Sequence, residues 1–122
     1  RPKGLPVSSR LLCEAHKRLM QGVRGANKDP GNLRKVQNWI GGRGPDSIRF
    51  VPPPPDAVVA SMHALDTWIH SDDTTHPLVK AGLAHVQFET IHPFLDGNGR
   101  LGRLLITLLL CDQGALAQPL LY

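Results

Sequence analysis

Cysteine is scarce in this sequence. Only two of its 122 residues are cysteines, Cys13 and Cys111, and no Cys-x-x-Cys pair occurs. A disulfide framework is therefore excluded. Each cysteine stands within an apolar helical pattern, so we expect both to act as small hydrophobic side chains in the interior.

Long apolar runs and aromatic clusters are also missing. The longest apolar run, Leu104 to Cys111, is far too short to cross a bilayer, and no segment resembles a signal peptide. We therefore expect a cytoplasmic protein without a membrane partner. Aromatic residues make up only 5% of the chain, and they are not interleaved with a Lys/Arg block. A nucleic-acid-binding surface usually has that interleaving, so we do not expect nucleic acid as a partner of this domain.

Charge is distributed unevenly along the chain. Residues 1–50 contain 11 of the 14 Lys and Arg residues and three acidic ones, whereas residues 51–122 contain three basic and seven acidic residues. A basic half suits a polyanion or a phosphate ligand, although a solvated basic face would explain the same pattern. The length predicts a single domain over residues 1–122, and its abrupt ends lead us to expect a piece of a longer protein.

Four segments carry helix signals, which are a capping residue such as Ser8, a proline in the first turn, or apolar residues spaced by three and four. They cover about residues 9–23, 56–69, 77–90 and 99–114. The apolar stripes of the first two are expected at Leu12, Ala15, Leu19 and Val23, and at Val58, Met62, Leu65 and Ile69. The third is apolar nearly all round, which predicts a central helix.

The segment between the first two predicted helices indicates a small β-hairpin. Asn38–Ile40 and Ser47–Val51 have strand character, and a Gly/Pro turn at residues 41–46 joins them. Two strands alone are marginally stable, so the hairpin must lean on the helices. The predicted fold class is therefore all-α with a small β-hairpin.

The stretch HPFLDGNGRLGR, residues 92–103, interrupts two apolar segments with polar side chains. Pro93 should end the third helix, and the fourth should begin near Gly99, so a tight loop leads directly into a helix N-terminus. Free N–H groups and the helix dipole favour an anion there. Gly97 and Gly99 would let the backbone approach a ligand closely.

Four side chains of this stretch fit phosphate chemistry. Arg100 and Arg103 are three residues apart, so they share a helix face and can bind phosphate oxygens. Asp96 suits Mg²⁺, which is typically held by one or two carboxylates together with substrate phosphates. His92 has the ordinary pKa range of a general base near neutrality. Singly, each has an ordinary structural explanation, and only their combination in one turn indicates a site.

This stretch resembles the signature of the Fic family, His-x-Phe-x-Asp/Glu-Gly-Asn-Gly-Arg-x-x-Arg, at every fixed position. The likeness continues upstream through LPVSSRLLCEAHKRLMQGVRG, PGNLRKVQNWIGG, FVPPPP and LAHVQFETIHPF, and covers nearly the whole chain. These segments are similar to the core of bacterial Fic proteins that carry an N-terminal inhibitory region. The resemblance implies a mainly helical Fic-type bundle that transfers AMP from ATP to a Ser, Thr or Tyr hydroxyl of a target protein and releases pyrophosphate.

The resemblance also implies a role for each matched residue. His92 would deprotonate the target hydroxyl, and Asp96 would hold Mg²⁺. The anion hole would be lined by Gly97, Gly99 and Asn98, the last with its side chain. Arg100 and Arg103 would bind the β/γ end of ATP. The hairpin would be a flap, residues 38–51, that docks the target by strand addition, with Ile48 and Phe50 near the α-phosphate. Arg24 either reaches the nucleotide or shapes a loop.

Two further features refine this expectation. Gly99 stands where the related Doc kinases carry lysine, which by analogy favours AMP transfer over γ-phosphate transfer. The inhibitory motif Ser/Thr-x-x-x-Glu-Gly/Asn, whose glutamate pairs with the second motif arginine, here Arg103, does not occur in the chain. We therefore expect the inhibitory element in a segment outside residues 1–122 or in a partner, and a chain that is less inhibited than its parent.

Three alternatives share the same residues. A phosphotransferase or an enzyme that removes AMP would use the same site with another donor or direction. A non-enzymatic nucleotide-binding regulator would exploit the basic half of the chain. A binder of that kind needs neither a base at His92 nor a metal ligand at Asp96, which favours an enzyme.

Overall fold

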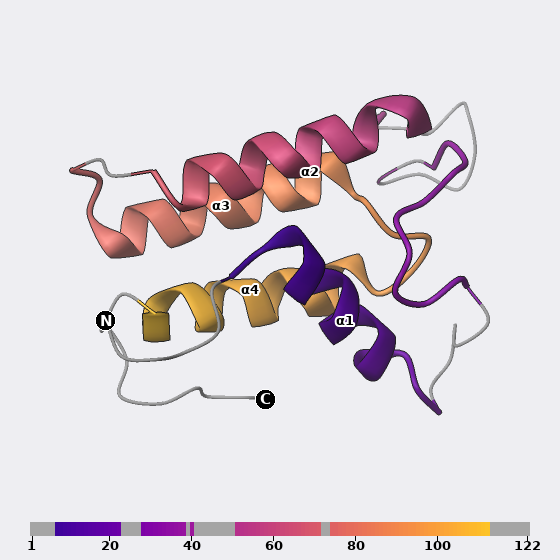
Figure 1. Ribbon diagram of the computed structural model, residues 1–122, viewed down its shortest axis with the longest axis horizontal. Helices are drawn as coiled ribbons and strands as arrows, with labels where there is room; N and C mark the ends of the chain where they lie inside the picture. The colour runs from indigo at the N-terminus through magenta and orange to yellow at the C-terminus, as the bar shows by residue number, and fades with distance from the viewer. Residues whose placement is uncertain (1–6, 23–27, 39, 41–50, 72–73, 113–122) are drawn as a thin grey trace.

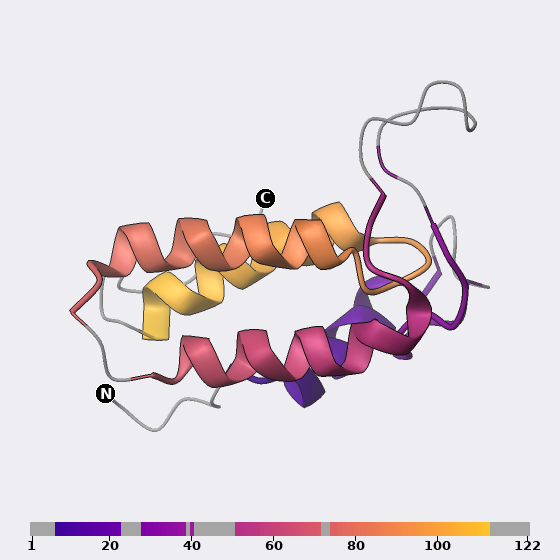
Figure 2. The same ribbon diagram turned by 90° about the horizontal axis from the view of Figure 1, so that it is seen from above.

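A computed structural model of the chain describes residues 7–22, 28–38, 40, 51–71 and 74–112. Within these ranges it contains the helices α1 (Ser9–Leu19), α2 (Pro55–Ile69), α3 (Pro77–Ile91) and α4 (Asn98–Asp112). Helices α2 and α3 lie side by side along the length of the molecule (Figure 1), and α4 runs beside α3 (Figure 2). None of these helices in the described part of the chain is both long and apolar enough to cross a membrane.

The caps and prolines predicted from the sequence mark the helix starts. Ser8 is the N-cap of α1, and its Oγ accepts a hydrogen bond from the Leu11 N–H at 3.1 Å. Pro55 and Pro77 occupy the first turns of α2 and α3, where a missing N–H costs nothing. The predicted buried stripe of α2, from Val58 to Ile69, is confirmed.

Helix α1 differs from its prediction in length and in phase. It ends at Leu19, not near Val23, and Met20 forms its C-cap. The buried positions are Leu12, His16 and Met20, whereas the expected stripe residues Ala15 and Leu19 are only half-buried. The predicted phase was wrong because the stripe followed apolar residues alone, whereas the helix also buries His16.

Helix α3 packs against both α2 and α4, as a central helix should, and Ala84 and Phe88 in it have no exposed surface. Its outer side is nevertheless uncovered by any described residue, and Leu78, Val79, Leu83 and Val86 are each more than half exposed. The all-round apolar character of this helix therefore reflects an interior face plus an exposed apolar face.

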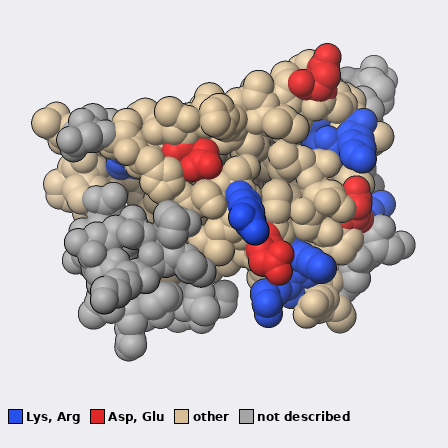
Figure 3. Space-filling model, viewed as in Figure 1, with Lys and Arg blue, Asp and Glu red and all other residues tan. Residues whose placement is uncertain are grey.

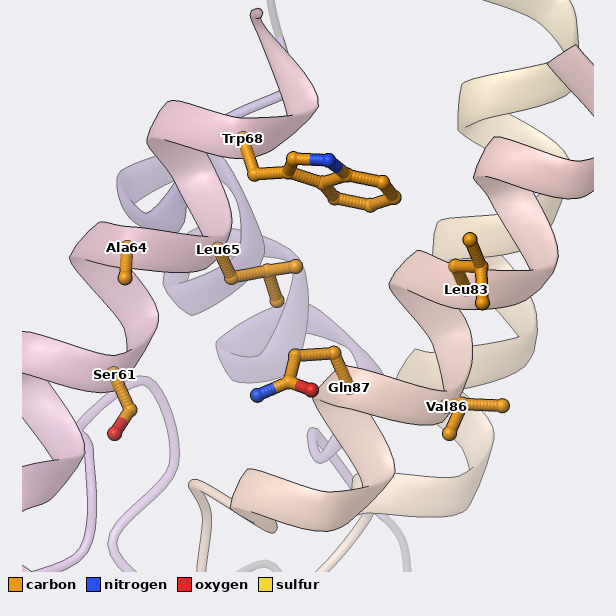
Figure 4. A pocket seen from close by; sticks show the side chains of 7 residues that line it. All are labelled: Ser61, Ala64, Leu65, Trp68, Leu83, Val86 and Gln87. Carbon is orange, nitrogen blue, oxygen red and sulfur yellow. The ribbon is translucent and has the colours of Figure 1, made fainter. Parts of the chain in front are cut away.

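A groove of about 410 Å³ lies between α2 and α3 on that outer side. Figure 4 shows the indole of Trp68 reaching from α2 toward α3 across it. Its lining consists of Ser61, Ala64, Leu65, Trp68, Leu83, Val86 and Gln87. None of these is charged, so the groove does not suit a phosphate ligand.

The predicted hairpin falls mostly outside the described residues. Both flap residues, Ile48 and Phe50, lie there, as does Arg24. Of the flap predicted over residues 38–51 the structure describes residues 38, 40 and 51. The flanking residues 36–37 and 52–53 run beside the loop that joins α3 to α4 (Figure 1). The helical fold class is confirmed within the described ranges, and the flap stays a prediction.

Candidate functional site

The signature stretch forms the loop between α3 and α4 together with the first turns of α4. His92 is the C-cap of α3, and α4 begins at Asn98, one residue before the predicted start. A cavity of about 280 Å³ opens at this point. It is lined by His92, Leu95, Asp96, Gly97, Asn98, Gly99, Arg100 and Arg103. The structure thus brings together, around one loop cavity, every signature residue that the sequence assigned to catalysis, metal binding or phosphate binding.

His92 has an unusual backbone and a partly buried ring. Its φ of 49° and ψ of 61° place it in the left-handed region, which is disfavoured for a residue with a Cβ. The ring Nδ1 is buried without a well-aligned partner among the described residues. This leaves Nε2 as the ring nitrogen available to the cavity.

The surroundings of the His92 ring favour its neutral form. Burial lowers the pKa of His92 below its ordinary value of 6.5. The nearby Glu89, through its carboxylate charge and its backbone carbonyl, raises the pKa of His92, and the positive charge of Arg34 lowers it. Because the net shift is downward, the ring is neutral near pH 7 and can accept a proton.

The start of α4 presents the groups expected of an anion site. Arg100 and Arg103 are exposed on its first turns. The Nη1 atom of Arg103 lies 3.6 Å from the point where a Cβ on Gly99 would stand, so its guanidinium folds back toward the helix N-terminus. Two guanidinium groups and free backbone N–H groups therefore border the same cavity.

Asp96 is exposed at the rim of the cavity and fits a magnesium ion. One of its carboxylate oxygens, Oδ1, accepts the Gly97 N–H at 2.8 Å. No group of three or more His, Cys, Asp or Glu side chains comes together in the described part of the chain. A metal at Asp96 would thus rely on phosphate oxygens for its other ligands, which is the usual coordination of Mg²⁺.

Asn98, whose side chain the family resemblance assigns to the anion hole, lines the cavity and also closes the loop. Its side chain is only 3% exposed. The amide oxygen accepts from the Phe94 N–H at 2.9 Å, and the amide nitrogen donates to the Phe94 carbonyl at 2.7 Å. Both ends of the amide therefore close the loop on itself, which leaves one amide N–H and the backbone N–H for a ligand.

His16 supports the loop from the inside and was missed by the sequence interpretation. It is fully buried and stacks on Phe94 with ring centroids 3.9 Å apart. Its Nδ1 accepts the Gly31 N–H at 2.9 Å, which assigns the proton to Nε2, and Nε2 lies 2.6 Å from the Asp96 carbonyl. The available signal was the spacing of Leu12, His16 and Met20 by four residues, since a polar residue on a buried face demands partners.

The same inner contact explains Gly97. This residue has φ of +82°, and a Cβ there would lie 2.8 Å from Sδ of Met20 and 3.3 Å from Nε2 of His16. Only glycine satisfies both the backbone conformation and the close approach. The turn that exposes Asp96 is therefore shaped by α1.

Arg34 is the second residue that the sequence interpretation missed. It is 2% exposed and lies in the segment between α1 and α2. Its guanidinium donates to backbone carbonyls at both His92 and Pro53, each at 2.7 Å. A buried arginine is rare unless it is paired, but no local pattern in the sequence identifies its partners.

The charged surface agrees with the uneven charge of the sequence. In Figure 3 most of the visible Lys and Arg atoms lie over α1 and toward the end of the molecule that carries the loop between α3 and α4, whereas the part over α2 shows isolated acidic groups and little basic surface. The loop cavity lies at the basic end, which suits a polyanionic ligand.

Fold and site together define a helical domain with a cavity, lined by a histidine, an aspartate and two arginines, at the start of its last described helix. The model of the Fic/DOC family matches residues 6–110, and the chain belongs to this family. Among curated relatives, the protein adenylyltransferases Fic of Drosophila erecta and Drosophila melanogaster are 35% and 34% identical over 115 residues. That alignment covers 90% of this chain and 21% of each relative, so the chain spans about a fifth of their length.

Solved structures have the same fold. A Fic family protein from Desulfovibrio desulfuricans is 36% identical, with a TM-score of 0.70, over 85% of this chain and 30% of its own. Fic-1 from C. elegans is 25% identical, with a TM-score of 0.72, over 88% and 29%. These relatives come from animals and bacteria alike, so the likeness does not single out the bacterial group that the sequence suggested.

Proposed function

We propose that this domain transfers AMP from ATP to a Ser, Thr or Tyr hydroxyl of a target protein and releases pyrophosphate. The observation that carries the proposal is the shared cavity, in which a neutral His92 faces a helix N-terminus flanked by Arg100 and Arg103. The name that the Drosophila relatives carry, protein adenylyltransferase, supports the same activity.

The proposed reaction begins with the target hydroxyl beside His92. Its oxygen forms a bond to the α-phosphorus of ATP as its proton passes to Nε2 of His92. The bond from the α-phosphorus to the oxygen that bridges to the β-phosphorus breaks, and pyrophosphate leaves with that electron pair. Arg100 and Arg103 hold the β/γ end, where negative charge accumulates.

The metal and the loop backbone complete this scheme. Asp96 would hold Mg²⁺, which when bound neutralises phosphate charge. The backbone N–H groups at the N-terminus of α4, from Asn98 onward, would donate hydrogen bonds to phosphate oxygens. The lack of a side chain at Gly99 leaves room there, which favours the α-phosphate as the transferred group by the contrast with the Doc kinases.

The partners follow from the same proposal. The target would dock on the flap, whose residues Ile48 and Phe50 would pin it near the α-phosphate. An inhibitory segment or partner would act by contacting Arg103, which is exposed and therefore reachable. We also propose a cytoplasmic location, where ATP and Mg²⁺ are abundant.

Labelled nucleotides test the proposal. The protein is incubated with Mg²⁺ and ATP labelled at either the α- or the γ-phosphate, and the label retained on protein is measured, with His92→Ala as the control. Retention from the α position alone, lost in His92→Ala, is expected. Retention from the γ position alone would show a phosphotransferase and overturn the proposal.

A further inference from the structure

Arg34 joins its own segment to two distant parts of the chain through its guanidinium group. Nε donates to the His92 carbonyl at 2.7 Å, and Nη1 donates to the Val36 carbonyl at 3.0 Å. Nη2 donates to the carbonyls of Pro53 at 2.7 Å and of Ile91 at 3.0 Å. All three guanidinium nitrogens are thus hydrogen-bonded in the interior.

The backbone of Arg34 adds a further bond to the same loop, because its N–H donates to the Pro93 carbonyl at 2.8 Å. Arg34 therefore binds the carbonyls of the three consecutive residues Ile91, His92 and Pro93. The last carbonyls of a helix have no partner inside it, and the helix dipole favours a cation near them. Arg34 supplies both the donors and the charge at the C-terminus of α3.

These bonds hold His92 in a conformation that it would not choose alone. The left-handed backbone of a residue with a Cβ persists when its surroundings fix it. Here the carbonyl of His92 is bound by Arg34, and its own N–H is bound to the Phe88 carbonyl at 2.9 Å. This backbone conformation sets the direction in which the ring leaves the chain.

The same group fixes the two described segments that flank the predicted flap. Arg34 binds the carbonyl of Val36 on one side and that of Pro53 on the other. Gln37 joins the two sides directly, because its Nε2 donates to the Pro52 carbonyl at 3.0 Å. The segments on both sides of the predicted flap and the backbone of His92 are therefore bound to one cation.

We propose that Arg34 is a positioning residue that holds the His92 ring toward the loop cavity and keeps the segments that flank the predicted flap in place beside it. This inference rests on the proposed function, since it takes His92 as the base. Arg34 does not line the cavity, so it acts through the backbone of His92 and not on a substrate. Lysine could not replace it, because a single ammonium cannot reach carbonyls on several sides as the planar guanidinium does.

The test uses Arg34→Lys, with the exposed neighbour Lys35→Ala as a matched control. Initial rates of self-modification with α-labelled ATP are measured over a range of ATP concentrations. The measurement is made well below the melting temperature of each variant and is expressed per folded molecule. We expect Arg34→Lys to lower the limiting rate about 10-fold to 100-fold by misplacing the base. The half-saturating ATP concentration should not change, because the phosphate-binding groups on α4 are untouched.

A second readout does not depend on the reaction. The titration of the His92 ring is followed by NMR without nucleotide, with its signal assigned by its loss in His92→Ala. The charged groups that act on this ring are Glu89 and Arg34. Since burial is the main cause of the lowered pKa of His92, a released ring in Arg34→Lys should titrate at higher pH. Lys35→Ala should leave the titration unchanged.

The outcomes separate the possible roles. An Arg34→Lys variant that melts earlier but keeps the limiting rate and the His92 titration would show a purely stabilising role and overturn the proposal. If the unaltered chain transfers no AMP, the proposed function fails, while the His92 titration still decides about Arg34. If Arg34→Lys does not fold, Asn38→Ala serves instead, since the Asn38 amide donates to the same His92 carbonyl at 3.4 Å. A smaller decrease in the limiting rate together with a His92 titration at higher pH supports the proposal, and no change in either overturns it.

Discussion

The loop between α3 and α4 has two sides of opposite character. Toward solvent it presents Asp96, Arg100 and Arg103, which are exposed. Toward the interior it rests on His16 and Arg34, which are 0% and 2% exposed and hydrogen-bonded to backbone groups of the loop and its flanks. The outer side can bind a ligand, and the inner side fixes where the outer groups stand. Substitutions on the two sides should therefore affect stability and AMP transfer differently.

The largest effect is expected on the inner side, from His16→Leu. This change leaves the Gly31 N–H and the Asp96 carbonyl without their partner, at about 1–3 kcal/mol for each buried group. The displaced loop should also slow AMP transfer about 100-fold, since small misplacements of reacting groups have effects of that size. Chemical denaturation and transfer from α-labelled ATP measure both losses.

The control for His16 is the exposed His63 on α2, whose change to alanine should leave stability and transfer unaltered. A His16→Leu variant that loses activity but no stability would mean that His16 is not part of the support of the loop. It would place His16 with the outer, ligand-binding groups instead.

The outer side should respond to Arg103→Ala with the opposite balance. Arg103 is exposed and makes no side-chain hydrogen bond or ion pair within the described ranges, so the free energy of unfolding should change by less than about 0.5 kcal/mol. Loss of a charge-assisted contact to phosphate, worth about 1.5–3 kcal/mol, should weaken ATP use about 10-fold to 100-fold. The measurement is the rate of transfer against ATP concentration.

A stability loss in Arg103→Ala as large as that of His16→Leu would contradict this division. So would an ATP dependence equal to that of the unaltered protein. The exposed Arg18 on α1 offers a matched control, since it lies outside the lining of the cavity and its change to alanine removes the same charge.

The outer side of the loop could be predicted from the sequence, and the inner side could not. Asp96, Gly99 and Arg100 are close in the chain, so loop and helix geometry alone bring them to one cavity. His16 and Arg34 contact the loop from 80 and 58 residues away, and their partners are backbone carbonyls that any residue would offer. The helix starts were predictable for a similar reason, because prolines and caps act locally.

The α1 stripe shows the limit most clearly. Traced through apolar residues alone, it runs over Ala15 and Leu19, whereas the helix buries His16 and Met20. The spacing of Leu12, His16 and Met20 could have marked His16 as buried, but its partners Gly31 and Asp96 are not evident until the tertiary contacts are known. Hydrophobic patterns therefore do not predict buried polar residues that hold a loop by hydrogen bonds.

The smallest effect should come from Gly99→Ala, and its contrast with the neighbouring Gly97→Ala separates the two sides of the loop within a single turn. In Gly97→Ala the new Cβ would face Met20 Sδ at 2.8 Å with φ at +82°, so something must shift. In Gly99→Ala the nearest atom would be Nη1 of Arg103 at 3.6 Å, an ordinary contact. Alanine is also favoured over glycine in a helix by about 0.5–1 kcal/mol, so Gly99→Ala should be neutral or slightly stabilising.

Denaturant midpoints of the two variants, compared at equal m-values, measure this difference. Gly97→Ala should lose at least about 1 kcal/mol, the usual cost of a left-handed conformation for a residue with a Cβ. Gly99→Ala should instead keep its stability, while the added methyl group beside Arg103 slightly weakens ATP use. Equal losses in both would show that the outer side is packed as tightly as the inner side. In that case Arg103 would be a structural residue of α4, and the cavity would have to accommodate ATP without its help.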